Sequence, residues 1–143
     1  MSWATGARAH LQEAADLTAF LSGAYEAFEG MLVVIRAHES RAEDMFAAFV
    51  MAAVSAANGR DAVATAPSLP RIGSGIRPPT EGDLVAAASV QEIAGDLASL
   101  GRVLADRLVG AARSAPDGAD RAACAAAARD AGNIYLLFSG AGP

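Results

Sequence analysis

Apolar side chains recur at three- and four-residue steps along most of this chain, and this spacing limits its possible folds more than any other feature. The clearest run consists of Ile93, Leu97, Leu100, Leu104 and Leu108. Such spacing places side chains on one face of an α-helix and is typical of a helix–helix seam. Strand-forming residues seldom alternate with polar ones, so a sheet is hard to build from this sequence. The pattern therefore predicts an all-α protein.

A single antiparallel four-helix bundle is the expected architecture, with two long helices and two shorter ones. The 143 residues fit one domain, residues 1–143. Hydrophobic residues make up 53% of the chain, and many of them are alanine, which has the best helix propensity and lets helices approach closely. We expect the helices over residues 5–37, 40–58, 80–114 and 117–138, with a connector over residues 59–79.

The boundary between the first two expected helices is open to two interpretations. Ser40 followed by Glu43 matches a capping box, which predicts that the second helix starts at Ser40. Only His38 and Glu39 separate it from the first helix, so the two segments form either a tight hairpin or one long helix. We favour the hairpin, because a helix of about 50 residues greatly exceeds the mean of about 11–12.

The two later helices also have recognisable start signals. Thr80 followed by Asp83 resembles a capping pair, and Asp117 can cap the last helix. The apolar residues 134–138 either continue that last helix or form an apolar tail on the bundle. We favour these two interpretations over a short strand, because the sequence offers no second convincing strand to pair with it.

The Pro- and Gly-rich connector is the least regular part of the sequence. Asn58 and Gly59 are expected to end the second helix, since glycine readily takes the left-handed conformation found just after helix ends. Four prolines and a Gly-Ser-Gly triplet follow. A loop this long is unusual within a compact domain and is either an ordered strap or a mobile segment. Because function concentrates in loops, the candidate partner-binding residues are Arg60, Asp61, Leu69 and Arg71.

Charge and cysteine content exclude several classes of partner. The net charge is −5, and the arginines are scattered, which argues against nucleic-acid binding. The single Cys124 rules out an internal disulfide and is expected to be a small buried residue.

The longest apolar run, residues 45–57, is shorter than the roughly 20 residues of a membrane span, and the first residues lack the apolar segment of a signal peptide. We therefore expect a cytoplasmic protein with no membrane partner.

Helical bundles often hold carboxylate-bridged metals, and this sequence lacks the usual ligand pattern. Di-iron bundles combine glutamates with two Glu-x-x-His motifs. The only histidines are His10 and His38, and neither has a glutamate three residues before it. Carboxylate pairs such as Glu26 and Glu29 are expected to be solvated. We predict no metal and no cofactor.

His38 beside Glu39 is the one place to look for acid–base chemistry. Arg36 and Arg41 lie close in sequence, and cationic neighbours disfavour an imidazolium. A surface histidine at a helix end is the expected outcome. The sequence contains no recognisable nucleophile motif or phosphate-binding loop, so we predict no catalytic residue.

These observations favour a non-enzymatic helical interaction module, acting as an adaptor or as a self-associating scaffold. Alanine-rich faces give a thin core that a second copy can complete, which predicts a homodimer. Aromatic residues expected near the surface are Trp3, Tyr25, Tyr135 and Phe138, and aromatic residues are enriched where proteins meet partners. The alternative is a bundle that binds a small hydrophobic ligand between its helices. A carboxylate-metal, ferritin-like enzyme is the weakest hypothesis.

Overall fold

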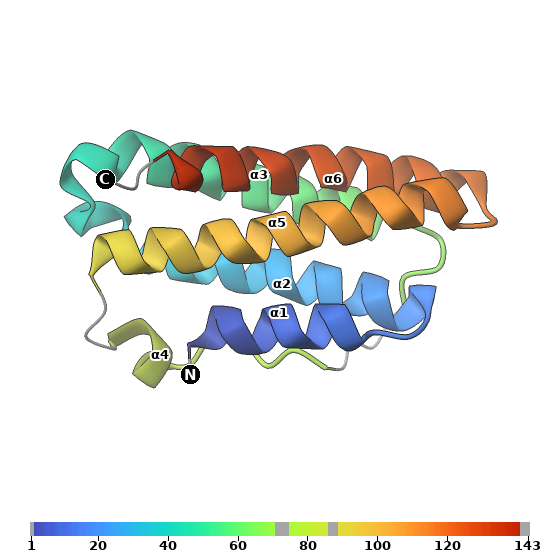
Figure 1. Ribbon diagram of the computed structural model, residues 1–143, viewed down its shortest axis with the longest axis horizontal. Coiled ribbons are helices and arrows are strands. Elements are labelled where there is room, and N and C mark those ends of the chain that lie inside the picture. Colours follow the sequence, from blue (N-terminus) through green and yellow to red (C-terminus); the bar gives the residue numbers. More distant parts are fainter. Residues whose placement is uncertain (1, 71–74, 86–88, 141–143) are drawn as a thin grey trace.

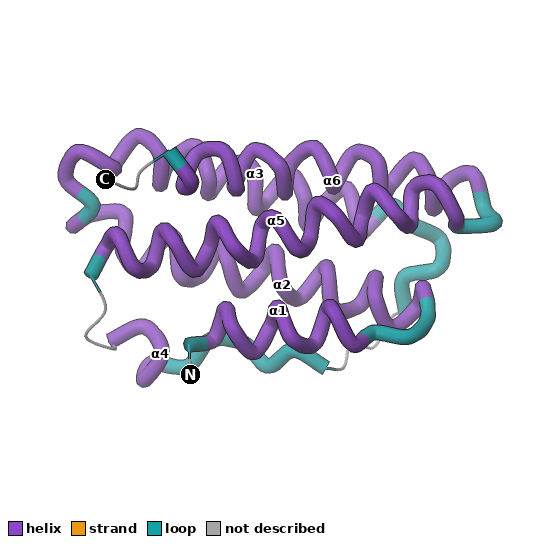
Figure 2. Tube along the Cα trace, viewed as in Figure 1, coloured by secondary structure: helices purple, strands orange, loops and turns teal. Residues whose placement is uncertain are grey.

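The protein is all-α, as predicted. The computed structural model describes residues 2–70, 75–85 and 89–140, and all regular elements in these ranges are helical (Figures 1 and 2). The α-helices are α1 (Trp3–Glu13), α2 (Leu17–His38), α3 (Phe46–Ala64), α4 (Glu81–Val85), α5 (Val90–Ser114) and α6 (Gly118–Ser139), and two 3-10 turns, η1 (Glu39–Arg41) and η2 (Glu43–Met45), join α2 to α3.

The long helices lie side by side along the long axis of the molecule (Figure 1). Helix α6 packs against both α5 and α3, α3 also packs against α2, and α1 packs mainly on α5. The core between them combines many alanines with a few large side chains. Phe49 and Phe138 meet edge to face, with ring centroids 5.0 Å apart. Aromatic pairs in this geometry stabilise a core beyond the area that they bury.

The helix predicted over residues 5–37 is two helices, and the break lies between α1 and α2. Asp16 is extended, and its Oδ1 accepts a hydrogen bond from the Ala19 amide at 2.8 Å, so it is the N-cap of α2. At the other side of the break, Arg107 of α5 donates to the Ala14 carbonyl at 2.9 Å. A cation near a helix C-terminus is favourable, so both ends at the break are stabilised.

Two 3-10 turns separate α2 from α3, so the alternative of a single long helix is wrong. The predicted capping box is also wrong, because Ser40 lies inside η1 and no side chain caps η1, η2 or α3. Glu43 has φ 53°, a left-handed conformation that interrupts a right-handed helix. Helix α3 consequently begins at Phe46 instead of Ser40.

Gly59 lies inside α3, contrary to the prediction that the helix ends there. The helix continues to Ala64, and Gly59 is buried against the ring of Phe28 from α2. A Cβ at Gly59 would stand closer than 3.0 Å to the ring. Gly59 is therefore needed because α2 and α3 approach each other closely, and not because a helix ends there.

The described parts of the predicted connector are held against the helices. Residues 59–64 are helical, and beyond them the Ser68 amide donates to Asp120 of α6 at 3.0 Å. The Ser68 hydroxyl also donates to Asp120. Farther on, Ile76 is buried, and the Trp3 indole Nε1 donates to the Arg77 carbonyl at 2.8 Å. These contacts fit the strap interpretation for the described residues.

The helix predicted over residues 80–114 contains two described helices, α4 and α5. The Thr80–Asp83 capping pair is confirmed: the Thr80 amide donates to Asp83 at 2.7 Å and the Asp83 amide to Thr80 at 3.2 Å. This pair opens only the five-residue α4. Helix α5 has its own N-cap, Ser89, which accepts from the Glu92 amide at 3.1 Å.

Helix α6 agrees closely with its prediction. The Asp117 side chain accepts from two amides of the first turn, which confirms it as the N-cap. The helix continues through residues 134–138, so the helical interpretation of that apolar stretch is confirmed and the tail interpretation is not needed.

Among the described residues, one stretch is long and apolar enough to cross a membrane by length and composition. It is Leu17–Arg41, and 56% of its most apolar window is buried among the other helices. A buried core helix satisfies the same criterion, so this feature is weak evidence for a membrane span.

Candidate functional site

Three of the four residues predicted to bind a partner lie in the described structure, at the end of α3 and just beyond it. Arg60 and Asp61 lie on α3, where the Arg60 Nε is 3.2 Å from Asp61 Oδ1 and its Nη1 is 4.0 Å from Glu29 Oε2 of α2. Leu69 is half-buried and lines a cavity of about 560 Å³ between α2 and the end of α3. Arg71 lies outside the described residues. A joint role for the four stays a prediction.

An exposed, mainly apolar groove lies between α3 and α6, and we call it the α3–α6 groove. Its volume is about 590 Å³. Its apolar side chains include Met51, Val54 and Leu136, whose exposed fractions are 58%, 55% and 67%. The full lining is Val50, Met51, Val54, Ser55, Asn58, Asp130, Asn133, Leu136 and Leu137.

The sequence of α3 explains why this surface exists. Phe49, Ala52, Ala53 and Ala56 form its buried face, and Met51 and Val54 are apolar residues beyond that face. A helix that is apolar on several sides normally has neighbours on several sides. Phe46, four residues before Val50 in the groove lining, is also 52% exposed. Helix α3 therefore has apolar surface that the single chain leaves uncovered.

Among the described residues that line the α3–α6 groove, Asp130 is the only ionisable one. Burial raises the pKa of its carboxyl, and the neighbouring Arg129 partly opposes this shift. The remaining polar groups of the lining are the amides of Asn58 and Asn133 and the hydroxyl of Ser55. The groove is thus mostly apolar and nearly uncharged.

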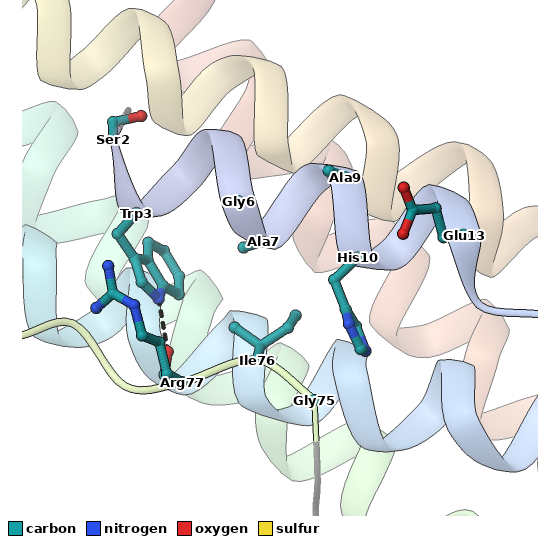
Figure 3. Close-up of a pocket in the computed structure, with 10 residues that line it drawn as sticks. All are labelled: Ser2, Trp3, Gly6, Ala7, Ala9, His10, Glu13, Gly75, Ile76 and Arg77. Carbon is teal, nitrogen blue, oxygen red and sulfur yellow. Dashed lines mark hydrogen bonds between the residues drawn. The ribbon is translucent and has the colours of Figure 1, made fainter.

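Trp3 is buried and lines two further cavities at the start of α1. Its indole packs against Gly30 of α2, where any side chain would collide with the ring. The larger cavity, of about 380 Å³, also contains Ile76 and His10 in its lining. Figure 3 shows these side chains in a row between α1 and the segment that carries Gly75 and Arg77.

The smaller cavity lies where the starts of α1 and α5 meet the end of α2 and α4, and we call it the Trp3–His38 cavity. Its volume is about 220 Å³. Its lining is Ser2, Trp3, Ala4, Val34, His38, Gly82, Asp83, Ile93, Asp96 and Leu97.

His38 is buried, with an exposed fraction of 4%, so the expectation of a surface histidine is wrong. Arg41 donates to the ring through Nε at 3.1 Å and approaches the same Nδ1 with Nη2 at 2.9 Å. Because a guanidinium only donates, Nδ1 must accept, and the neutral ring carries its proton on Nε2. Burial, and secondly the charge of Arg41, lower the pKa of His38. The predicted effect of a cationic neighbour on His38 is confirmed for Arg41.

The remaining reactive side chains are enclosed or dispersed. Cys124 is buried, as predicted, and burial raises the pKa of its thiol, with a further contribution from Asp120. Within the described ranges, no three His, Cys, Asp or Glu side chains group closely enough to hold a metal ion. Trp3 and Phe138 are buried in the core, which corrects their expected place near the surface.

No family model, curated protein or solved structure shows significant similarity to this chain.

Sequence reasoning missed both the α3–α6 groove and the Trp3–His38 cavity. The groove had a signal, because the long apolar run over residues 45–57, which includes Met51 and Val54, cannot be buried on a single helix face. The cavity had no such signal. Its walls come from segments far apart in sequence, and only the packing of α1 against α2 and α5 brings Trp3, His38 and Ile93 together.

Proposed function

We propose that this protein is a non-enzymatic helical interaction module that self-associates through the α3–α6 groove. Its scaffold is an antiparallel four-helix bundle of α2, α3, α5 and α6, a proposal supported by the short turn between α5 and α6 and by the side-by-side long helices. The observation that carries the functional proposal is the groove itself, where Met51, Val54 and Leu136 are each more than half exposed.

The size of the apolar surface indicates how strong the association is. Complete burial of one such side chain contributes about 1.5–3 kcal/mol, so covering the exposed half contributes about 1 kcal/mol. Three side chains on each of two protomers then contribute roughly 6 kcal/mol, before the cost of association. Additional contacts through Phe46 are needed for a stable pair, so the dimer is expected to be weak.

A second copy of the chain fits the chemistry of the groove. In a twofold interface each surface meets itself, so a strongly charged patch would repel its copy. The groove instead contains apolar groups and the amides of Asn58 and Asn133, which donate and accept equally. A groove between two helices also accepts an apolar helix face, which α3 of the second copy supplies.

Sedimentation equilibrium from low to high micromolar concentration tests this proposal. We expect reversible dimerisation, and we expect Val54→Asp to shift the protein to monomer because it puts a charge into the apolar contact. Val109→Asp is the matched control: Val109 is 40% exposed on α5, outside the groove, and its substitution should leave association unchanged. Circular dichroism checks that both variants remain helical. Two results would overturn the proposal. The wild-type protein could stay monomeric at high micromolar concentration, or the Val109 variant could lose dimerisation as much as the Val54 variant does.

A further inference from the structure

The Trp3–His38 cavity has the walls of a small-ligand site. Trp3, Ile93 and Leu97 are buried and form apolar walls, and Val34 is half-buried beside them. An engineered apolar cavity of about 150 Å³ accepts benzene. At about 220 Å³, this cavity has room for one aromatic ring with a short side chain.

His38 places an unpaired donor in this cavity. Its Nδ1 is occupied by Arg41, and Nε2 has no hydrogen-bond partner among the described residues. Every fully buried side-chain nitrogen or oxygen in the described part of the chain has a partner, so Nε2 must retain some accessible surface. His38 lines the cavity and is otherwise nearly enclosed, with an exposed fraction of 4%, which favours Nε2 as the group that faces the cavity. The Nε2–H group is therefore available to a ligand acceptor or aromatic face.

The free charge at the rim of the cavity is negative. Asp96 is exposed and has no ion-pair partner among the described residues, whereas Asp83 is held by Arg77 through contacts of 2.7 and 3.3 Å. Arg41 donates to Nδ1 of His38. A cationic ligand group is thus attracted to Asp96, and an anionic group is repelled.

We propose that the Trp3–His38 cavity binds a small aromatic amine, with its ring against Trp3 and beneath His38 and its ammonium group at Asp96. This site is separate from the α3–α6 groove, so its occupancy does not depend on self-association.

Trp3 is the only tryptophan, so its fluorescence in the full-length protein reports on the cavity directly. The probes are 2-phenylethylamine, 2-phenylethanol and 3-phenylpropionate, which share a phenyl ring and a two-carbon spacer and differ in charge. We expect saturable binding of the amine, roughly tenfold tighter than that of the propionate, because attraction at Asp96 is replaced by repulsion. An amine that produces no saturable change up to millimolar concentration, or a propionate that binds equally well, would overturn the proposal.

Two variants separate the rim charge from a general effect of protein charge. Asp96→Asn should make the affinities for the amine and the alcohol converge, while Asp106→Asn should leave the preference for the amine intact. Asp106 is the matched control because it is an exposed aspartate on the same helix that lines a different cavity. Equal effects of the two variants would contradict a role for Asp96. Both positions are exposed, so the comparison does not depend on a core substitution.

Discussion

A glycine-to-alanine substitution should destabilise the protein at Gly59, which contacts Phe28, and stabilise it at Gly95, another helical position. Alanine is favoured over glycine in a helix interior by about 1 kcal/mol. At Gly95 of α5 nothing lies within 4 Å of an added Cβ, so Gly95→Ala should stabilise the protein by that amount. At Gly59 the added Cβ would overlap the ring of Phe28, whose exposed fraction is 0%. Overpacking typically costs about 1–3 kcal/mol, and overlap with several ring atoms favours the upper end. We expect Gly59→Ala to destabilise the protein by about 2 kcal/mol.

Urea unfolding followed by circular dichroism measures both free energies under the same conditions. The two alanine variants should differ by about 3 kcal/mol. In a Phe28→Leu background the smaller side chain relieves the overlap, so the cost of Gly59→Ala should shrink. If Gly59→Ala raises the free energy of unfolding as much as Gly95→Ala does, α2 and α3 do not approach closely at Gly59 and Phe28.

Two further predictions concern buried polar groups. Because folding lowers the pKa of His38, the unfolded chain binds a proton more readily than the folded protein does. The free energy of unfolding should therefore fall as the pH drops below about 6.5. His38→Gln should flatten this pH dependence in urea titrations between about pH 5 and 8. No difference between the two pH profiles would exclude a buried neutral His38. Asp120→Asn should lower the free energy of unfolding by about 1–3 kcal/mol, because its carboxylate accepts both the amide and the hydroxyl of Ser68. Ser68→Ala in the Asp120→Asn background should then cost little more, and fully additive losses would contradict the pairing.

Local signals predicted much of the fold. The three- and four-residue spacing gave the all-α class, and Asp117 gave the start of α6. The capping pair at Thr80 was also correct, although it opens a much shorter helix than expected. These signals succeed because each depends on residues within one or two turns of one another.

The errors arose where distant residues decide the local structure. Gly59 has the sequence of a helix end, but the ring of Phe28 from another helix occupies the space that a larger side chain would need. The break at Asp16 is reinforced by Arg107, which is more than ninety residues away. Local signals do not contain such contacts, so periodicity extended one helix through the break and the Asn58-Gly59 signal ended another too early.

The candidate sites were less predictable than the fold. A loop rich in proline drew attention to Arg60 and Leu69, whereas the broad apolar surface lies on the regular helices α3 and α6. His38 was singled out as the one place for acid–base chemistry but was expected at the surface, and its burial depends on the neighbouring α1 and α5. A helix can be predicted from its own sequence, while the uncovered part of its surface depends on where every other helix packs.

Because Cys124 is buried, the reactivity of its thiol reports on opening of the fold around α6. It is the only cysteine, it is fully buried in α6, and α6 contacts both α3 and α5. A thiol reagent can therefore reach sulfur only when α6 moves away from its neighbours or the whole molecule unfolds. The rate of labelling, compared with that of the unfolded chain, measures the free energy of that opening without any engineered probe.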